Sequence, residues 1–329
     1  MVEFKGRTHM TGNEQIPSLH SPVMINEVLY AMSPRAGAVY VDGTFGRGGY
    51  SRALMNEADC QVVAIDRDPD ALDAAQDLEK EYRKRFKFVE GCFGQIKETL
   101  TELGHEKVDG IVLDLGVSSP QIDQRERGFS FQSEGPLDMR MSRSGLSAAD
   151  VVNTYSQEDI ANILYQYGEE KKSRAIARKI VERRSEKKVE TTLELANLIR
   201  SVIPDHVSGR IHPATRTFQA LRIYVNQELE ELEKFLEQVM GCLKENGRLV
   251  IVSFHSLEDR LVKKFFAANA QKQESPNRNL PLYMPRKAAH YFIQPDRKGL
   301  IASEAEVQMN PRSRSARLRW GILERGEVA

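Results

Sequence analysis

The chain has 329 residues and carries 47 basic and 47 acidic side chains, so its formal net charge is zero. This balance argues against a protein that wraps nucleic acid over its whole surface, and any such contact is expected from a local patch. Apolar residues at 40% and charged residues at 29% are typical of a globular protein. No run approaches the roughly 18 apolar residues that span a bilayer, and the N-terminus lacks a signal-peptide pattern. We therefore expect a cytoplasmic protein with no membrane segment.

The three cysteines, Cys60, Cys92 and Cys242, lie far apart and match no spacing typical of zinc ligands or a redox dithiol. We interpret all three as reduced structural thiols. The sequence predicts no metal site.

Strand-like and helix-like segments alternate along the first part of the chain, after a polar stretch over 1–20 that predicts a loose N-terminal segment. Apolar runs rich in β-branched residues predict strands at 39–41, 62–65, 86–89, 111–115 and 249–253, and helices follow the first three. Near-continuous apolar strands separated by helices are typical of a parallel sheet that is covered on both faces.

The alternation stops after Leu115, because the stretch 118–211 is helical or irregular. A long amphipathic helix follows it. Its apolar face is formed by Leu229, Leu232, Leu236, Val239 and Leu243, and Gly247 is expected to end it. A charged, loop-rich stretch over 270–317 precedes a last strand at 318–323. We predict an α/β fold with a doubly wound sheet from 21–120 and 212–329 and an inserted helical domain at 121–211.

A glycine-rich turn joins the first strand to the next helix. The strand runs into Asp42, and glycines at 46, 48 and 49 let the backbone turn tightly and approach a ligand closely. The second strand ends at Asp66, beside this turn, where a carboxylate can accept both hydroxyls of a ribose. Together these features predict a nucleotide-type site.

Dinucleotides and S-adenosylmethionine share this arrangement, and two details favour S-adenosylmethionine. A pyrophosphate-binding loop prefers G-x-G-x-x-G, but the third glycine position holds Ser51. Asp42 would also repel a pyrophosphate, whereas a cationic sulfonium with an amino-acid tail tolerates it. The remaining alternative is that the glycines form only a βα turn.

The fourth strand delivers a second polar motif to the same edge of the sheet. It ends at Asp114 and continues into Ser118, Ser119 and Pro120. Methyl transfer to the amino group of cytosine is difficult because its lone pair is delocalised into the ring, so acceptors that bind the amino hydrogens favour attack. The Asp114 carboxylate, the two serine hydroxyls and the carbonyls beside Pro120 are candidate catalytic groups. An ordinary turn is the alternative.

Several long motifs occur together, at 42–49 (DGTFGRGG), 65–69 (IDRDP), 113–121 (LDLGVSSPQ), 127–131 (RGFSF), 135–141 (GPLDMRM), 212–219 (HPATRTFQ) and 253–260 (SFHSLEDR). In these segments the chain resembles the RsmH (MraW) family of bacterial 16S ribosomal RNA cytosine-N4 methyltransferases. The resemblance runs from about residue 20 to the C-terminus.

The resemblance implies a class I methyltransferase fold, S-adenosylmethionine as the methyl donor, and a decoding-site cytidine of 16S ribosomal RNA in the small ribosomal subunit as the acceptor. The donor-binding residues that it implies are Gly48, Gly49, Tyr50, Asp66, Phe93, Asp114 and Gln121. Tyr50 stands where the family often has His, which puts a side-chain contact at this position in doubt. Phe129 or Phe131 is a candidate to stack on the target base.

Cations of the inserted domain are the candidate RNA contacts. Ile176, Ala177, Ile180 and Val181 form an apolar stripe on a predicted helix, which leaves Lys171, Arg174 and Arg178 on the opposite face. Arg216 and Arg222 are either phosphate ligands or ion-pair partners. A second basic set consists of Arg312, Arg314, Arg317 and Arg319. Charge runs are also commonly just solvated surface, which is the alternative for both sets.

His255 lies at the end of the fifth strand and is a candidate general base, although the methylated amine is acidic enough to lose its proton to water. Ser256 with Asp259 is the pattern of a helix cap.

Three functions are consistent with the pattern: an RNA methyltransferase, an NAD-dependent oxidoreductase, and a non-catalytic RNA-binding assembly factor. The missing third glycine disfavours the second, and the intact set of Gly48, Asp66 and Asp114 disfavours the third. The oligomeric state is not encoded in these motifs.

Overall fold

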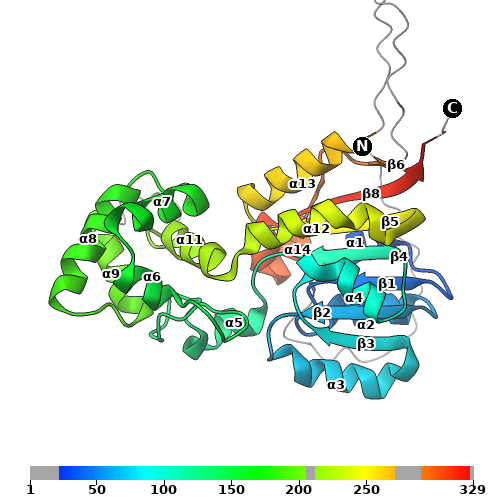
Figure 1. The fold of residues 1–329 in the computed structure, drawn as a ribbon, viewed down its shortest axis with the longest axis horizontal. Helices are drawn as coiled ribbons and strands as arrows, with labels where there is room; N and C mark the ends of the chain where they lie inside the picture. The colour runs from blue at the N-terminus through cyan, green and yellow to red at the C-terminus, as the bar shows by residue number, and fades with distance from the viewer. Residues whose placement is uncertain (1–21, 205–211, 271–289, 327–329) are drawn as a thin grey trace, which may run out of the picture.

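The computed structural model describes residues 22–204, 212–270 and 290–326. The expected loose segment at 1–20 lies outside these residues. One sheet with the strand order β3-β2-β1-β4-β5-β8-β6 forms the centre of the larger part of the molecule, and β7 pairs with β8 (Figure 1). Its strands are β1 (Val39–Asp42), β2 (Gln61–Asp66), β3 (Phe86–Glu90), β4 (Val108–Asp114), β5 (Leu243–Ser253), β6 (His290–Ile293), β7 (Leu300–Ile301) and β8 (Arg317–Arg325).

The first five strands are parallel, and β8 runs antiparallel to β5. The helices of this part are α1 (Ile25–Met32), α2 (Gly49–Glu57), α3 (Ala71–Tyr82), α4 (Ile96–Glu102), α12 (Glu228–Cys242), α13 (Ser256–Ala268) and α14 (Glu304–Met309). This is the doubly wound α/β sheet that the sequence predicted. All six predicted strands are confirmed.

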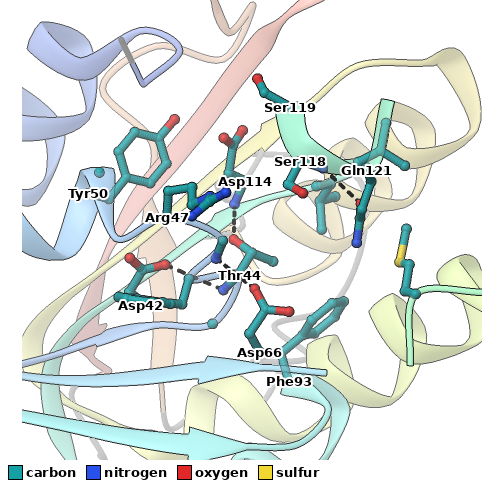
Figure 2. Close-up of a pocket in the computed structure, with 18 of the residues that line it drawn as sticks. Asp42, Thr44, Arg47, Tyr50, Asp66, Phe93, Asp114, Ser118, Ser119 and Gln121 are labelled. Carbon is teal, nitrogen blue, oxygen red and sulfur yellow. Dashed lines mark hydrogen bonds between the residues drawn. The ribbon is translucent and has the colours of Figure 1, made fainter. Parts of the chain in front are cut away.

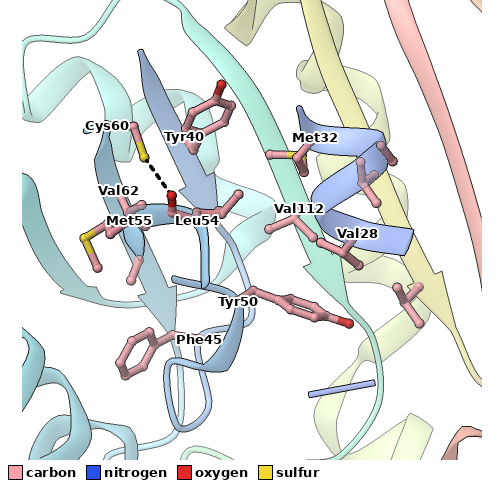
Figure 3. Packing of buried hydrophobic residues seen from close by; sticks show 14 of the residues in the cluster. Val28, Met32, Tyr40, Phe45, Tyr50, Leu54, Met55, Cys60, Val62 and Val112 are labelled. Atoms are coloured by element: carbon pink, nitrogen blue, oxygen red, sulfur yellow. Dashed lines mark hydrogen bonds between the residues drawn. The ribbon is translucent and has the colours of Figure 1, made fainter. Parts of the chain in front are cut away.

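The sheet is buried on both faces, which explains why its strands are almost continuously apolar. On β5, Val250 and Val252 join the core under α1, α2 and α3, while Leu249 and Ile251 join the core under α4, α12 and α13. Figure 3 shows the first of these cores, where Leu54 and Tyr50 from α2 pack near Val112 of β4. The three cysteines are free thiols.

A separate helical unit lies at one end of the sheet (Figure 1). It contains α6 (Ala148–Thr154), α7 (Gln157–Gly168), α8 (Ser173–Glu186), α9 (Thr192–Val202) and α11 (Thr215–Asn226), and the short α5 (Ser119–Asp123) leads into it. These helices have a hydrophobic core of their own, which includes Ile160, Ile180 and Leu195.

Helix α11 falls on the sheet side of the expected boundary at 211/212, yet it buries Phe218 and Leu221 in the core of the helical unit. We therefore propose that the inserted unit extends to Asn226. The polypeptide enters this unit after β4 and returns to the sheet through α12 (Figure 1).

Two expectations about local structure were wrong. The long amphipathic helix ends at Cys242, and Leu243 is already the first residue of β5, paired with Val108 of β4. Gly247 consequently lies inside β5 instead of ending the helix. Of the stretch 270–317, expected to be loop-rich, residues 271–289 lie outside the described residues, and the rest contains the short elements β6, β7 and α14 between irregular segments. Among the described residues, no helix has the length and apolar character needed to cross a membrane.

Candidate functional site

The glycine-rich turn is closed by the carboxylate of Asp42, the last residue of β1. Its Oδ2 accepts hydrogen bonds from the Ser51 backbone N–H at 3.1 Å and the Ser51 hydroxyl at 2.7 Å, and its Oδ1 accepts from the Thr44 N–H at 3.4 Å. Ser51, at the position of the missing third glycine, therefore ties α2 to β1. Burial raises the pKa of Asp42 to about 6, although these hydrogen bonds oppose the rise.

Asp66, at the end of β2, holds the other side of the turn. Its Oδ2 accepts from the Gly46 N–H at 2.6 Å, and its Oδ1 accepts from the Asp68 N–H at 2.8 Å. Gly46 and Gly48 have φ values of 54° and 77°, which L-residues rarely adopt. Burial raises the pKa of Asp66 to about 6, against the effect of these hydrogen bonds.

Asp114, at the end of β4, is the third carboxylate at this edge of the sheet. Its backbone N–H donates to the Thr44 hydroxyl at 2.6 Å, which joins β4 to the glycine turn. Its Oδ1 is buried and has no hydrogen-bond partner among the described residues. Burial first, and then the charges of Asp42 and Glu258, raise the pKa of Asp114 well above its usual value.

The Ser118–Pro120 segment begins a short helix rather than a plain turn. Ser118 is the N-cap of α5, and its backbone N–H donates to Gln121 Oε1 at 2.9 Å. The Gln121 amide donates in turn to Asp68 Oδ2 at 2.6 Å. Gln121 is therefore buried between the ends of β2 and β4.

These groups line one cavity of about 230 Å³ (Figure 2). Of the residues expected from the sequence, it is lined by Gly49, Tyr50, Asp66, Phe93, Asp114, Ser118, Ser119, Pro120 and Gln121. Gly48 is not among the lining residues. Gly48 instead contributes to the shape of the turn, because a β-carbon at this position would come within 2.7 Å of the Phe45 ring.

The Tyr50 side chain makes a hydrogen bond to the segment that precedes α1. The ring is buried, and its hydroxyl donates to the Val23 carbonyl at 2.5 Å. This bond brings Pro22 and Val23 over α2, where they form part of the cavity wall. His could not make the same long-range contact from this position.

Sequence reasoning missed several wall residues that come from distant parts of the chain. They are Pro22, Val23, Met141, Glu228, Glu231, Phe254, Glu258 and Asn310, and Arg312, predicted as an RNA contact, also lines the cavity. Met141 ends the 135–141 motif, and Phe254 and Glu258 lie in the 253–260 motif, so these motifs were the available signal for them.

The predicted RNA contacts of the helical unit lie away from this cavity. Arg174 and Arg178 are exposed on α8, with Ile176 and Ala177 buried beneath them, as the stripe predicted, whereas Lys171 is exposed in the turn before this helix. The Arg178 Nε is 3.8 Å from Glu182, and Arg216 is exposed and donates to the Glu169 carbonyl at 3.3 Å.

Other candidate arginines are held by carboxylates. Arg222 is half-buried and donates to both Glu228 oxygens at 2.8 Å, which makes it an ion-pair partner. Arg319 makes a bidentate ion pair with Asp259, in which Nε donates to Oδ1 at 2.7 Å and Nη2 donates to Oδ2 at 3.1 Å.

The two phenylalanines that are candidates to stack on a base are half-buried and contact other side chains. The guanidinium of Arg127 lies over the Phe129 ring, and Phe131 stacks on His212 with 4.5 Å between ring centroids. Neither lines the cavity.

The expected helix cap was assigned to the wrong residues. The N-cap of α13 is His255, whose Nδ1 accepts from the Glu258 N–H at 3.4 Å, and Glu258 completes the box by accepting from the His255 N–H at 3.3 Å. Asp259 is engaged by Arg319 instead. Because Nδ1 is an acceptor, we assign the imidazole proton to Nε2, which is 3.1 Å from Glu258 Oε1.

Glu228, His255 and Glu258 place potential ligand atoms within 4.8 Å of one another. Arg222 already binds both Glu228 oxygens, and the protonated His255 Nε2 faces Glu258. Burial acts to raise the pKa of Glu258, but His255, Arg222 and the Phe254 N–H outweigh it, and the pKa is lowered. The trio is therefore an internally compensated charge network, and we assign no metal to it.

A family model described as the MraW methylase family matches residues 17–323. The chain belongs to the MraW methylase family. Proteins called Ribosomal RNA small subunit methyltransferase H are 54% identical in Parvibaculum lavamentivorans and 52% identical in Rhodospirillum rubrum. The match covers 92% of this chain and 88% of the first relative, and 94% of both chains in the second.

A solved structure of an rRNA methylase from Streptococcus thermophilus aligns over 92% of this chain and 94% of its own, with a TM-score of 0.39 and 10% identity. Membership of the MraW methylase family rests on the sequence match alone.

We expect the stability difference between wild type and Asp42→Asn to change with pH. The pKa of Asp42 is about 6 when folded, against 3.8 for an ordinary Asp. Its contribution to stability is therefore fully present below the unfolded pKa and is lost as the pH rises through about 6. Asn removes this titration, so the variant should gain up to about 3 kcal/mol relative to wild type between about pH 4 and pH 7.

Urea unfolding across this pH range measures the effect. The exposed Asp73→Asn serves as the control and should give a flat difference. A difference for Asp42→Asn that is independent of pH would contradict the assignment of a buried, destabilised charge.

Proposed function

We propose that this protein transfers a methyl group from S-adenosylmethionine to the N4 amino group of a cytidine in the decoding region of 16S ribosomal RNA, within the small ribosomal subunit. The observation that carries the proposal is the buried, unpartnered Oδ1 of Asp114 in the cavity between the glycine turn and α5. A methylase needs a methyl donor and an acceptor to meet, and this cavity offers groups suited to both.

The donor side is formed by the glycine turn and Asp66. A carboxylate at the end of β2 suits the hydroxyls of a ribose, and Phe93, packed edge-on against Phe235, gives the site an apolar wall. The carboxylates of Asp42 and Asp114 give the deep part of the cavity a negative potential, which suits a sulfonium and an ammonium group. When bound, S-adenosylmethionine supplies an activated methyl group on a positively charged sulfur.

The acceptor side is formed by Asp114 and the start of α5. Carboxylate and hydroxyl oxygens at Asp114, Ser118 and Ser119 can accept the hydrogens of an exocyclic amine and so localise its lone pair on nitrogen. The transfer breaks the sulfur–methyl bond of the donor as the carbon–nitrogen bond forms, so the donor leaves as a neutral thioether, and the extra proton of the methylated amine passes to water. No general base is required, which agrees with His255 being turned toward Glu258.

The substrate is inferred from the relatives, which are called Ribosomal RNA small subunit methyltransferase H. An oxidoreductase using NAD is the weaker alternative, because the acidic cavity would repel a pyrophosphate. A non-catalytic assembly factor is weaker still, because Asp66, Asp114 and the glycine turn retain a geometry suited to a ligand.

We expect Asp66→Ala to raise the dissociation constant for S-adenosylmethionine by about ten- to hundredfold, since a charge-assisted hydrogen bond contributes roughly 1.5 to 3 kcal/mol. Isothermal calorimetry measures the change, with exposed Asp73→Ala as the matched control. Unchanged affinity in a folded Asp66→Ala protein would remove this residue from the site. NAD should not bind the wild type, and measurable NAD affinity would favour the oxidoreductase.

Asp114→Ala should abolish methyl transfer, because it removes the acceptor between the donor and amine positions. Asp114→Asn tests the same loss with the side-chain volume kept. The assay supplies labelled S-adenosylmethionine with free 16S ribosomal RNA or assembled small subunits, and identifies the labelled nucleoside. A near wild-type rate in both variants, or a label on a nucleoside other than N4-methylcytidine, would contradict this assignment.

The helical unit is proposed to hold the RNA through Lys171, Arg174 and Arg178. Each neutralised phosphate adds roughly 0.7 to the slope of log affinity against log salt, so replacing all three by Gln should flatten the slope by up to about 2. Donor affinity should not change. The control replaces three exposed lysines, Lys80 of α3, Lys84 of the 3-10 turn that follows it and Lys87 of β3. Equal slopes for the two triple variants would show that α8 is not the RNA track.

A further inference from the structure

Arg127 is the most heavily engaged arginine at the junction of the sheet and the helical unit. It lies in a 3-10 turn, Arg125–Arg127, shortly after α5, and its side chain is only 5% exposed. Its Nη1 donates to Asp70 Oδ2 at 2.6 Å and to Asp68 Oδ1 at 3.2 Å. Its Nη2 donates to Asp68 Oδ2 at 3.0 Å and to the carbonyls of Met141 at 2.9 Å and Arg140 at 3.1 Å.

The acidic partners of Arg127 belong to the loop after β2. Asp68 is 7% exposed, and the oxygen that binds Arg127 Nη2 also accepts from Gln121 at 2.6 Å. The Asp68 N–H is the group that Asp66 binds, and Asp66 in turn holds Gly46. Asp68 therefore connects Arg127 to Gln121 through its carboxylate, and to Asp66 and the glycine turn through its backbone N–H.

The carbonyl partners of Arg127 belong to the segment that leads into the helical unit. Met141 lines the cavity, and its N–H donates to Asn226 Oδ1 at 2.8 Å at the end of α11. Asn226 also donates to the Met139 carbonyl at 2.7 Å. Its own carbonyl accepts from Arg67, a neighbour of Asp66, at 2.6 Å. The helical unit is thus connected to the donor side of the cavity in two ways, through the Met141 carbonyl bound by Arg127 and through the Asn226 carbonyl bound by Arg67.

We propose that Arg127 is a positioning residue that sets the helical unit and the segment around Met141 in register with the donor-binding loops. This inference rests on the proposed function for what the two sides bind. A guanidinium is needed because it presents five N–H donors in one plane, which allows it to satisfy two carboxylates and two carbonyls together. A lysine keeps the charge but has three donors around one point. It would leave part of this buried network without partners.

Arg127→Lys tests the proposal at saturating donor and substrate. We expect kcat to fall by at least about tenfold, because small displacements of groups around a reaction centre can cost about a hundredfold. The donor dissociation constant should rise much less, since Asp66 and the glycine turn are intact. Arg260→Lys is the matched control, because Arg260 also joins the sheet part to the helical unit, through Glu169 at 2.9 Å, but it is exposed and far from Asp68. It should leave kcat unchanged.

A merely structural arginine would give a different result. Arg127→Lys would then lower the melting temperature, while kcat per folded molecule stayed at the wild-type value, and this outcome would overturn the proposal. Asp68→Asn provides a second variant, in case Arg127→Lys does not fold. If the pair acts as one unit, the double variant should lose no more kcat than the worse single variant. Additive losses would also overturn it.

Hydrogen exchange separates this proposal from the proposed substrate. Arg127→Lys should speed exchange in both 118–122 and 139–141, whereas Arg260→Lys should not. If wild type fails to methylate 16S ribosomal RNA but this exchange pattern appears, the proposed function is wrong and the coupling stands. Exchange that is unchanged in either segment would overturn the coupling, whatever the substrate.

Discussion

Three carboxylates at one edge of the sheet, those of the buried Asp42 and the half-buried Asp66 and Asp114, are the constraint on which the site depends. Parallel strands end together at this edge, so the fold concentrates like charges where solvent is excluded. The protein stabilises Asp42 and Asp66 with backbone N–H groups and the Ser51 hydroxyl, yet burial still raises the pKa of all three. A cationic ligand would favour the ionised forms and release protons on binding. The free protein therefore bears an electrostatic cost that such a ligand relieves.

The same edge explains why the helical unit is attached where it is. The chain leaves the sheet after β4, passes through α5, and returns at Asn226 to begin α12. Both connections between the sheet and the helical unit contribute residues to the cavity wall. The first contributes Ser118–Gln121 and the second contributes Glu228. Movement of the helical unit would consequently move parts of the cavity wall. We therefore expect the buried hydrogen bonds of Asp68 and Asn226 to affect the position of the cavity wall more than the exposed ion pair between Arg260 and Glu169 does.

Sequence reasoning worked where one physical signal was dominant. The apolar strands and the carboxylates at their ends were predictable because a parallel sheet buries both faces and gathers its carboxyl ends. The boundary between α12 and β5 was not predictable. Leu243 would be buried in a helix or in a strand, so the spacing of apolar residues does not distinguish the two. Most missed wall residues come from distant parts of the chain. Val23 is held at the site by the Tyr50 hydroxyl and Pro22 packs against Gly49, and no local sequence pattern predicts either contact. The cap at His255 was missed for another reason, since histidine is an uncommon N-cap.

The charges of the cavity wall discriminate between ligand classes more strongly than the glycine spacing does. Its acidic residues are Asp42, Asp66, Asp114, Glu228, Glu231 and Glu258, and its basic residues are Arg47, Arg67 and Arg312. Arg67 donates to the Asn226 carbonyl, and Arg312 is paired with Asp123 at 2.6 Å. A pyrophosphate would need cations or free N–H groups at the start of α2, but there Asp42 already accepts from Ser51. S-adenosylmethionine carries a sulfonium, an ammonium and only one carboxylate, so its two cationic groups suit the carboxylates of Asp42, Asp66 and Asp114 better than a pyrophosphate does.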